Sequence, residues 1–206
     1  MSSTADQTVT YQPGSARGMT IGVAVVAAVA LAMTALDDMG AALRYLPTFL
    51  VVPAAVWAFY GRPAVIISDG GVALRNVLRT VELPWPAIQR IETKYALTLE
   101  TAYGPYNAWA APVPGRTLAS NRTHITMRHQ PESAYAAGGL RPGDLEGSPS
   151  GDASAYIRRR WEALRDAGHL DDPRLERQRP VVRWHPGPLL LVAALAAASA
   201  VSLSLG

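Results

Sequence analysis

Three long runs without a charged residue constrain the fold of this 206-residue chain more than any other feature. They extend over Met19–Leu36, Tyr45–Tyr60 and Pro186–Gly206. Each is close to the roughly 20 residues that an α-helix needs to cross the hydrocarbon core of a bilayer. We therefore expect an integral membrane protein with an N-terminal transmembrane hairpin over residues 19–60 and a third span over residues 188–206.

Two of these runs have an alternative interpretation. The first could be a secretory signal peptide, but the long preceding tail and the second apolar run close behind it favour a retained helix. The third is rich in alanine and serine, so it could be a terminal helix packed on a soluble core. Its lack of polar periodicity and the flanking Trp184 and His185 favour a membrane span.

The second run has the features of a membrane helix. Pro47 and Pro53 would disrupt a helix in water, but they are tolerated in a membrane helix, where neighbouring groups satisfy the freed carbonyls. Trp57, Phe59 and Tyr60 at its end are typical of an interfacial aromatic belt.

Charge predicts the orientation of the spans. Asp37, Asp38 and Arg44 are expected to form the connecting turn of the hairpin. The segment Gly61–His185 carries 17 basic and 13 acidic residues, a balance of +4. The positive-inside rule then places this segment and the N-terminal tail in the cytoplasm, with the turn and the C-terminus outside the inner membrane. The arginines nearest the membrane are Arg62, Arg174, Arg177, Arg179 and Arg183.

Short β-strands dominate the first part of the middle segment. Apolar residues alternate there with polar ones, and turn signals such as Asp69-Gly70-Gly71 and Tyr103-Gly-Pro-Tyr106 separate the runs. A Pro84-Trp85-Pro86 corner is expected to redirect the chain between two strands and to place Trp85 and Ile88 in the core. The predicted strands are Ala64–Ser68, Val72–Asn76, Thr80–Pro84, Gln89–Tyr95, Leu97–Thr101, Asn107–Pro112 and His124–Arg128.

One amphipathic helix follows, over Asp152–Ala167. We expect Ser150 or Asp152 to cap its start and Gly168 to end it, with Leu170 folding back. Strands followed by a helix predict a small antiparallel β-barrel with a C-terminal helix. Ala153, Ile157, Trp161 and Leu164 form the apolar stripe of this helix.

The run RPAVIISDGGVALRNVLRTVELPWPAIQRIE resembles the bacterial PH domain of the low molecular weight protein antigen 6 family of actinobacterial membrane proteins. The resemblance rests on Arg62-Pro63, Asp69-Gly70, Arg75-Asn76, Leu78-Arg79 and Pro84-Trp85 with Ile88. It implies an α+β membrane protein in which a PH-like domain spans residues 61–170, with a flexible insertion at about 130–151. A disordered tail would then cover residues 1–18, and a basic juxtamembrane linker residues 171–187.

The residues give little support for catalysis. The chain has no cysteine, and its four histidines lack any metal-ligand spacing. No glycine-rich loop precedes a helix as in a phosphate-binding site, and no aromatic residues alternate with arginines as in a nucleic-acid surface. We therefore expect no enzyme activity, no cofactor, no metal and no nucleic-acid partner.

Binding is the more probable class of function, because PH-like domains serve as platforms for proteins or phosphoinositides. We expect a membrane-anchored scaffold or interaction module with a protein partner, and anionic-lipid headgroup binding is the alternative. Arginine pairs well with phosphate, although these arginines could equally be solvated surface charges. We expect Arg158, Arg159 and Arg160 to fan outward beside Trp161 without converging, because they occupy successive positions of the helix. The candidate contacts are Arg75, Arg79, Arg158, Arg159 and Arg165.

Overall fold

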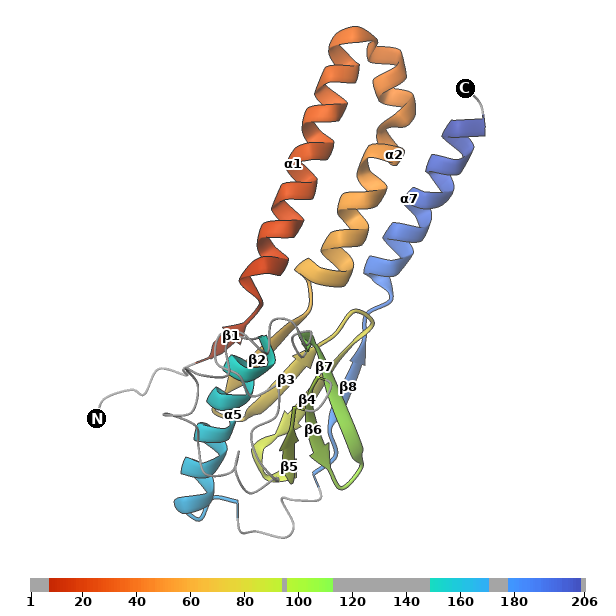
Figure 1. Ribbon diagram of the computed structural model, residues 1–206. Coiled ribbons are helices and arrows are strands. Elements are labelled where there is room, and N and C mark those ends of the chain that lie inside the picture. The colour runs from red at the N-terminus through yellow and green to blue at the C-terminus, as the bar shows by residue number, and fades with distance from the viewer. Residues whose placement is uncertain (1–7, 94–95, 113–148, 171–177, 205–206) are drawn as a thin grey trace, which may run out of the picture. The chain divides into compact units, whose positions relative to one another are not determined.

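The computed structural model describes residues 8–93, 96–112, 149–170 and 178–204 (Figure 1). The predicted strand His124–Arg128 and most of the predicted insertion lie outside these residues. The chain divides into two compact units. The helical unit comprises Pro13–Pro63, Val77–Arg79 and Trp184–Gly206, and the sheet unit comprises Met1–Gln12, Ala64–Asn76 and Thr80–Arg183.

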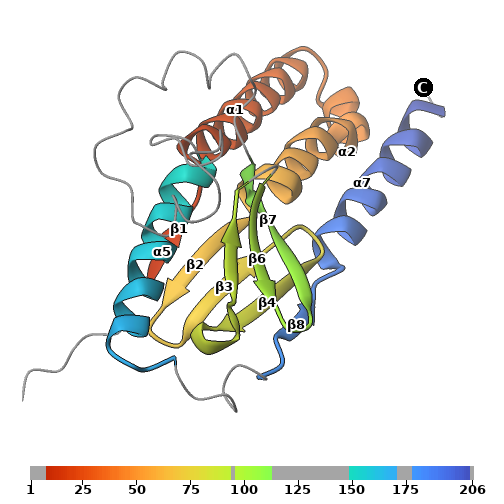
Figure 2. The ribbon, with the colours of Figure 1, turned by 60° about the horizontal axis from the view of Figure 1, so that its bottom comes forward.

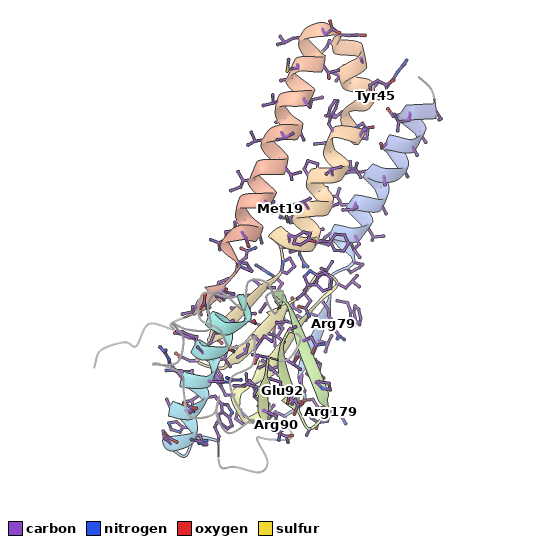
Figure 3. All side chains as sticks on the ribbon, in the orientation of Figure 1. Met19, Tyr45, Arg79, Arg90, Glu92 and Arg179 are labelled. Carbon is purple, nitrogen blue, oxygen red and sulfur yellow. The ribbon has the colours of Figure 1, made fainter. Side chains whose placement is uncertain are left out.

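Three helices long and apolar enough to cross a membrane form the helical unit. The first is α1 (Gly14–Asp37), and the last is α7 (Gly187–Ser204). Between them, α2 (Met39–Val56) continues into the π-helical turn η1 (Trp57–Gly61). Figure 3 shows side chains projecting outward all along α1 and α2, including the labelled Met19 and Tyr45. Such apolar exteriors suit hydrocarbon better than water.

The turn between α1 and α2 is shorter than expected. Asp38 alone forms it, and its Oδ1 accepts hydrogen bonds from the backbone N–H groups of Gly40 at 2.7 Å and Ala41 at 3.2 Å. Because this carboxylate caps α2 directly, the helix begins at Met39. The expectation that Arg44 belongs to the turn is therefore wrong, since Arg44 lies inside α2.

Serine and threonine hydroxyls join α7 to α2. Thr48 and Ser199 share a hydrogen bond of 2.8 Å, and the Ser202 hydroxyl donates to the carbonyl of Arg44. The serine residues that weaken the hydropathy of the third run thus form the contact with its neighbouring helix.

The described residues contain eight strands in two sheets, and the pairings from β1 to β4 and from β5 to β7 are antiparallel. The first has the order β1-β2-β3-β4-β8, and the second has the order β5-β6-β7 (Figure 2). The prediction of a closed barrel is wrong, because the chain leaves the first sheet at the proline corner and starts the second. The bounds are β1 Val9–Tyr11, β2 Ala64–Ser68, β3 Gly71–Arg75, β4 Arg79–Pro84, β5 Arg90–Glu92, β6 Ala96–Thr101, β7 Gly104–Pro112 and β8 Val181–Trp184.

Both edges of the first sheet come from segments that were expected to lack structure. In the predicted tail, β1 pairs with β2 through Val9↔Ile67 and Tyr11↔Val65, and α1 already begins at Gly14. In the predicted linker, β8 lies beside β4. Both strands are rich in β-branched and aromatic residues, which favour the strand conformation.

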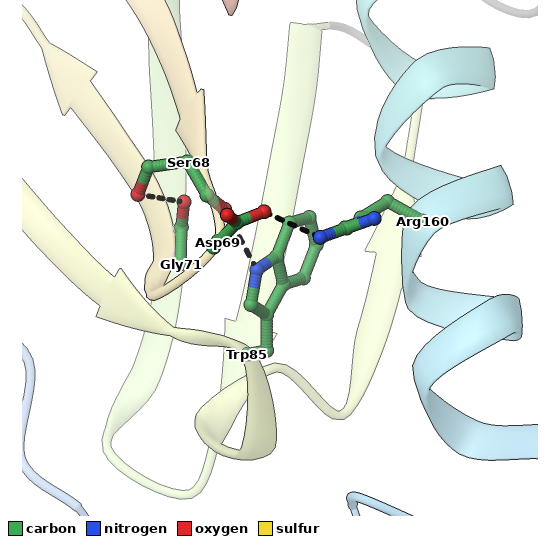
Figure 4. A network of polar contacts seen from close by, with 5 residues as sticks. All are labelled: Ser68, Asp69, Gly71, Trp85 and Arg160. Atoms are coloured by element: carbon green, nitrogen blue, oxygen red, sulfur yellow. Dashed lines mark hydrogen bonds and ion pairs between the residues drawn. The ribbon is translucent and has the colours of Figure 1, made fainter. Parts of the chain in front are cut away.

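The Pro-Trp-Pro corner fills the core as expected. Trp85–Ala87 forms a single 3₁₀ turn, and Trp85 and Ile88 are buried. The Trp85 indole Nε1–H donates to the carbonyl of Ser68 at 3.0 Å, which ties the corner to the β2–β3 turn (Figure 4). The corner therefore fixes both the direction of the chain and one end of β2.

Asn76 links the two sheets. Its Nδ2 donates to the Asn107 carbonyl at 2.8 Å, and its Oδ1 accepts from the Trp109 N–H at 2.8 Å. The side-chain amide thus bonds to β7 as the backbone of a neighbouring strand would. The β6–β7 turn is also tighter than predicted, because β7 starts at Gly104, which has a φ of +113°.

The helix α5 (Pro149–Asp166) runs beside β1 in both views of the molecule (Figures 1 and 2). It starts three residues before the predicted position, so Ser150 is buried inside its first turn and is not a cap. Gly168 ends it with a φ of +71°, and the N–H of His169 bonds back to Leu164 at 3.0 Å. The predicted stripe packs on the core: Ala153 and Ile157 are buried, and Trp161 and Leu164 are partly buried.

Candidate functional site

Arg158 is not available for a lipid headgroup. The structure buries it to 3% exposure, and its guanidinium donates to the carbonyl of Ile91 at 3.1 Å. It lies one residue after the buried Ile157, so the inner face of α5 is wide enough to include it. The expectation that this arginine fans outward is wrong, and its role is to satisfy the backbone of β5.

Arg160 holds α5 to the β2–β3 turn. Its guanidinium forms an ion pair with Asp69, next to the Trp85–Ser68 hydrogen bond (Figure 4). The candidate lipid contacts Arg75 and Arg79 follow this turn in the sequence. With an acidic residue at its tip that engages α5, the loop is poorly suited to bind an anion.

The remaining predicted arginines on α5 do not converge. Arg159 is exposed. The guanidinium of Arg165 lies 5.3 Å from the ring centroid of Trp161 and 3.3 Å from the carboxylate of Asp166. On the second sheet, Arg90 lies within 4 Å of Glu92 and Glu100 (Figure 3). Positive charge in the described part of the sheet unit is thus interspersed with acidic groups and forms no concentrated patch there.

The matched pair Arg158→Ala and Arg159→Ala tests this assignment. We expect Arg158→Ala to lower the free energy of unfolding by about 2 kcal/mol or more, because it leaves a buried carbonyl unsatisfied and removes packed methylenes. Arg159→Ala, on the exposed face, should change it by less than about 0.5 kcal/mol. Thermal unfolding of the detergent-solubilised chain measures both, and equal stability of the two variants would contradict the structural role.

The β3–β4 loop is fastened to the ends of the helical segments. The Arg62 guanidinium donates to the carbonyl of Val77 at 3.0 Å, and the N–H of His185 donates to the carbonyl of Leu78 at 2.7 Å. The Arg79 guanidinium lies 5.6 Å from the ring centroid of Trp184. We call these residues the junction cluster: Arg62, Val77, Leu78, Arg79, Trp184 and His185.

The sequence singles out three members of the junction cluster, but it does not predict that they lie together. Arg62 and Trp184 flank apolar runs, and Arg79 is a predicted headgroup contact. Their association could not be predicted from the sequence, because it depends on tertiary contacts that place the loop Val77–Arg79 in the helical unit. Arg75, the other candidate on this hairpin, lies in the sheet unit opposite Thr80.

The two ends of the helical unit differ in charge. The start of α1, the end of η1 and the junction cluster contribute Arg17, Arg62 and Arg79, with no acidic residue. The opposite end contains Asp37, Asp38 and Arg44. One end of the bundle therefore carries +3 and the other −1, which is the asymmetry that the positive-inside rule uses.

The described residues contain no cluster of metal-ligating side chains. Within them, no group of three or more His, Asp or Glu side chains could hold a metal ion. Burial, with a smaller contribution from Asp152, raises the pKa of Tyr11 to about 12. The Tyr11 phenol thus stays neutral at physiological pH and cannot serve as a base.

Residues 62–143 match the family model of a bacterial PH domain. The match covers less than half of the chain; it begins at the end of the α1–α2 hairpin and takes in the proline corner and β2 to β7, so this part of the chain is similar to a bacterial PH domain. This match is compatible with the resemblance to the low molecular weight protein antigen 6 family. No curated protein and no solved structure matches the chain significantly.

Proposed function

We propose that this protein is a membrane-anchored, non-catalytic binding module that displays its PH domain at the cytoplasmic face of the inner membrane. The observation that carries the proposal is the pairing of β1 with β2. Those strands flank the α1–α2 hairpin in sequence yet lie in one sheet. A segment that leaves and rejoins the same sheet must cross the membrane an even number of times, which fits two spans.

The charge asymmetry supports the cytoplasmic side. The positive end of the helical unit includes the connections to the sheet unit, at Arg62 and at Trp184–His185. By the positive-inside rule that end faces the cytoplasm, and α7 then takes the C-terminus to the other side.

Cysteine labelling tests the topology, because the chain has no native cysteine. We expect Asp37→Cys, at the end of α1 beside the hairpin turn, and Ser204→Cys, at the end of α7, to react with a membrane-impermeant maleimide in intact spheroplasts. Arg159→Cys, exposed on α5, should react only after permeabilisation. Labelling of Arg159→Cys in intact spheroplasts would contradict the cytoplasmic placement of the PH domain.

The proposed partner of the PH domain is a protein. Large exposed aromatic residues, Trp109 on β7 and Tyr103 in the β6–β7 turn, favour a protein contact. Arg179 lies 5.7 Å from the ring centroid of Tyr103 and adds a positive charge beside this ring. A photo-crosslinker at Trp109 should therefore give a discrete adduct in cells, whereas one at the ion-paired Arg90 should not.

Recognition of an anionic-lipid headgroup is the second candidate, and the junction cluster is the observation that favours it. Liposome binding distinguishes a protein partner from a lipid headgroup as the ligand of the PH domain. A fragment of residues 61–185 is unsuitable for this experiment, because it would lack β1 and leave the edge of β2 unpaired. The full chain in lipid nanodiscs avoids this defect.

A further inference from the structure

We propose that the helical unit holds one anionic phospholipid, with an acyl chain in a groove between α1, α2 and α7 and the phosphate at the positive end of the bundle. This inference rests on the membrane anchoring proposed above. It shares Arg62 and Arg79 with the second candidate function, and it adds a site for the acyl chain between the helices.

The groove is large and almost wholly apolar. Its volume is about 460 Å³, and its lining includes Ala24 from α1, Leu50 and Pro53 from α2, and Leu191 and Leu195 from α7. This volume is within the range of about 300–1,000 Å³ that is typical of small-molecule sites. Its one hydroxyl, from Thr20, donates to the carbonyl of Ala16 at 2.8 Å, so it is already satisfied. The occupant must therefore be a hydrocarbon chain or an apolar side chain.

One end of the groove lies at the positive end of the bundle, and we call this end its mouth. Thr20 lies one helical turn after Arg17, and Trp57 lies five residues before Arg62. Gly61 packs against both walls: a Cβ added there would lie 2.9 Å from the Thr20 hydroxyl and 3.2 Å from Trp57 Cδ1. The π-helical turn thus brings the start of α1 and the end of α2 together at the mouth of the groove.

Charge selects the occupant. Arg17, Arg62 and Arg79 give the mouth a formal charge of +3, and the acidic residues of the helical unit, Asp37 and Asp38, are at the other end of α1. Trp57, an aromatic residue of the type that favours the membrane interface, lines the groove. An apolar groove beside this positive charge favours an anionic phospholipid over a neutral one.

Native mass spectrometry of the full chain with phosphatidylglycerol and phosphatidylcholine of identical acyl chains tests the proposal. We expect one phosphatidylglycerol to be retained at least about tenfold more strongly than phosphatidylcholine, since each arginine near an anionic lipid contributes about 1 kcal/mol. Ala24→Phe fills the groove and should reduce retention about tenfold or more, and Arg17→Gln at the mouth should reduce it by a comparable factor.

Two matched variants serve as controls. Ala193→Phe adds the same ring to an exposed position of α7 at the depth of Leu191 and Leu195, and Arg44→Gln removes an exposed arginine from the opposite end. Both should leave retention unchanged. Because Arg17→Gln is an exposed substitution, it remains informative even if Ala24→Phe destabilises the bundle.

Three results would overturn the proposal: equal retention of the two lipids, retention unaffected by both Ala24→Phe and Arg17→Gln, or a dimer that Ala24→Phe dissociates while lipid binding is unchanged. The last would identify a second copy as the occupant. Lipid retention in detergent does not depend on which side the PH domain faces. The cysteine labelling therefore distinguishes failure of this inference from failure of the proposed function.

Discussion

Gly71→Ala is expected to prevent the sheet unit from folding. Gly71 has a φ of +157°, and a Cβ at this position would lie 2.2 Å from the carbonyl oxygen of Leu83. The obstacle is backbone of β4, where Gly71 pairs with Pro84, so no side chain can move aside. Overpacking in a core typically costs about 1–3 kcal/mol, and a clash between two paired backbones should exceed that range.

Gly70→Ala is the matched control, because a Cβ at Gly70 meets nothing within 4 Å. Hydrogen exchange of the full-length variants in detergent compares the two. We expect protection across β2, β3 and β4 to be lost in Gly71→Ala and retained in Gly70→Ala. Native-like protection in Gly71→Ala would show that the β3–β4 pairing differs from the one described.

The sequence predicts the turn at these glycines without identifying the essential one. Asp69-Gly70-Gly71 indicates a hairpin through local propensity alone. The requirement for Gly71 comes from β4, which approaches it from more than ten residues along the chain. Local patterns thus predict where the chain turns, and long-range contacts determine which residue can occupy the turn.

The same distinction explains what could be predicted of the fold. The long apolar helices α1, α2 and α7, the strands β2 to β4 and the helix α5 follow from length and periodicity. The edge strands β1 and β8 have three and four residues, too few to show a period, and they are stabilised only by their neighbours in the sheet. Whether the strands close into a barrel or form two sheets is likewise decided by tertiary packing.

The candidate site was predictable to a similar extent. Three consecutive arginines on α5 are equivalent by residue type, yet the structure buries Arg158, pairs Arg160 with Asp69 and leaves Arg159 exposed. The stripe of Ile157, Trp161 and Leu164 already indicated the inner face, but its width depends on how closely β5 approaches the helix. Arginine counting therefore overestimated the charge that the helix can present to a lipid.

Trp85→Ala should destabilise the sheet unit nearly as much as Gly71→Ala. Trp85 is 3% exposed, and truncation of a buried tryptophan typically costs about 3–5 kcal/mol. The variant also removes the Nε1–H donor to Ser68, the residue before the Asp69 that pairs with Arg160. We therefore expect the α5 contact at the β2–β3 turn to loosen together with the core.

Two further variants, Trp85→Phe and Trp109→Ala, separate the effects of the buried ring, its hydrogen bond and an exposed tryptophan on stability. Trp85→Phe keeps most of the buried ring and loses the hydrogen bond, which should cost about 1–3 kcal/mol because the Ser68 carbonyl loses its donor.

Trp109 is 56% exposed, so Trp109→Ala should cost much less than Trp85→Ala while weakening the proposed protein contact. Thermal unfolding and the crosslinking yield are measured on the same preparations. If Trp85→Ala proved as stable as Trp109→Ala, the corner would not be the centre of the core. A stable Trp109→Ala that loses its partner, beside a Trp85→Ala that loses both, would separate the scaffold of the PH domain from its binding surface.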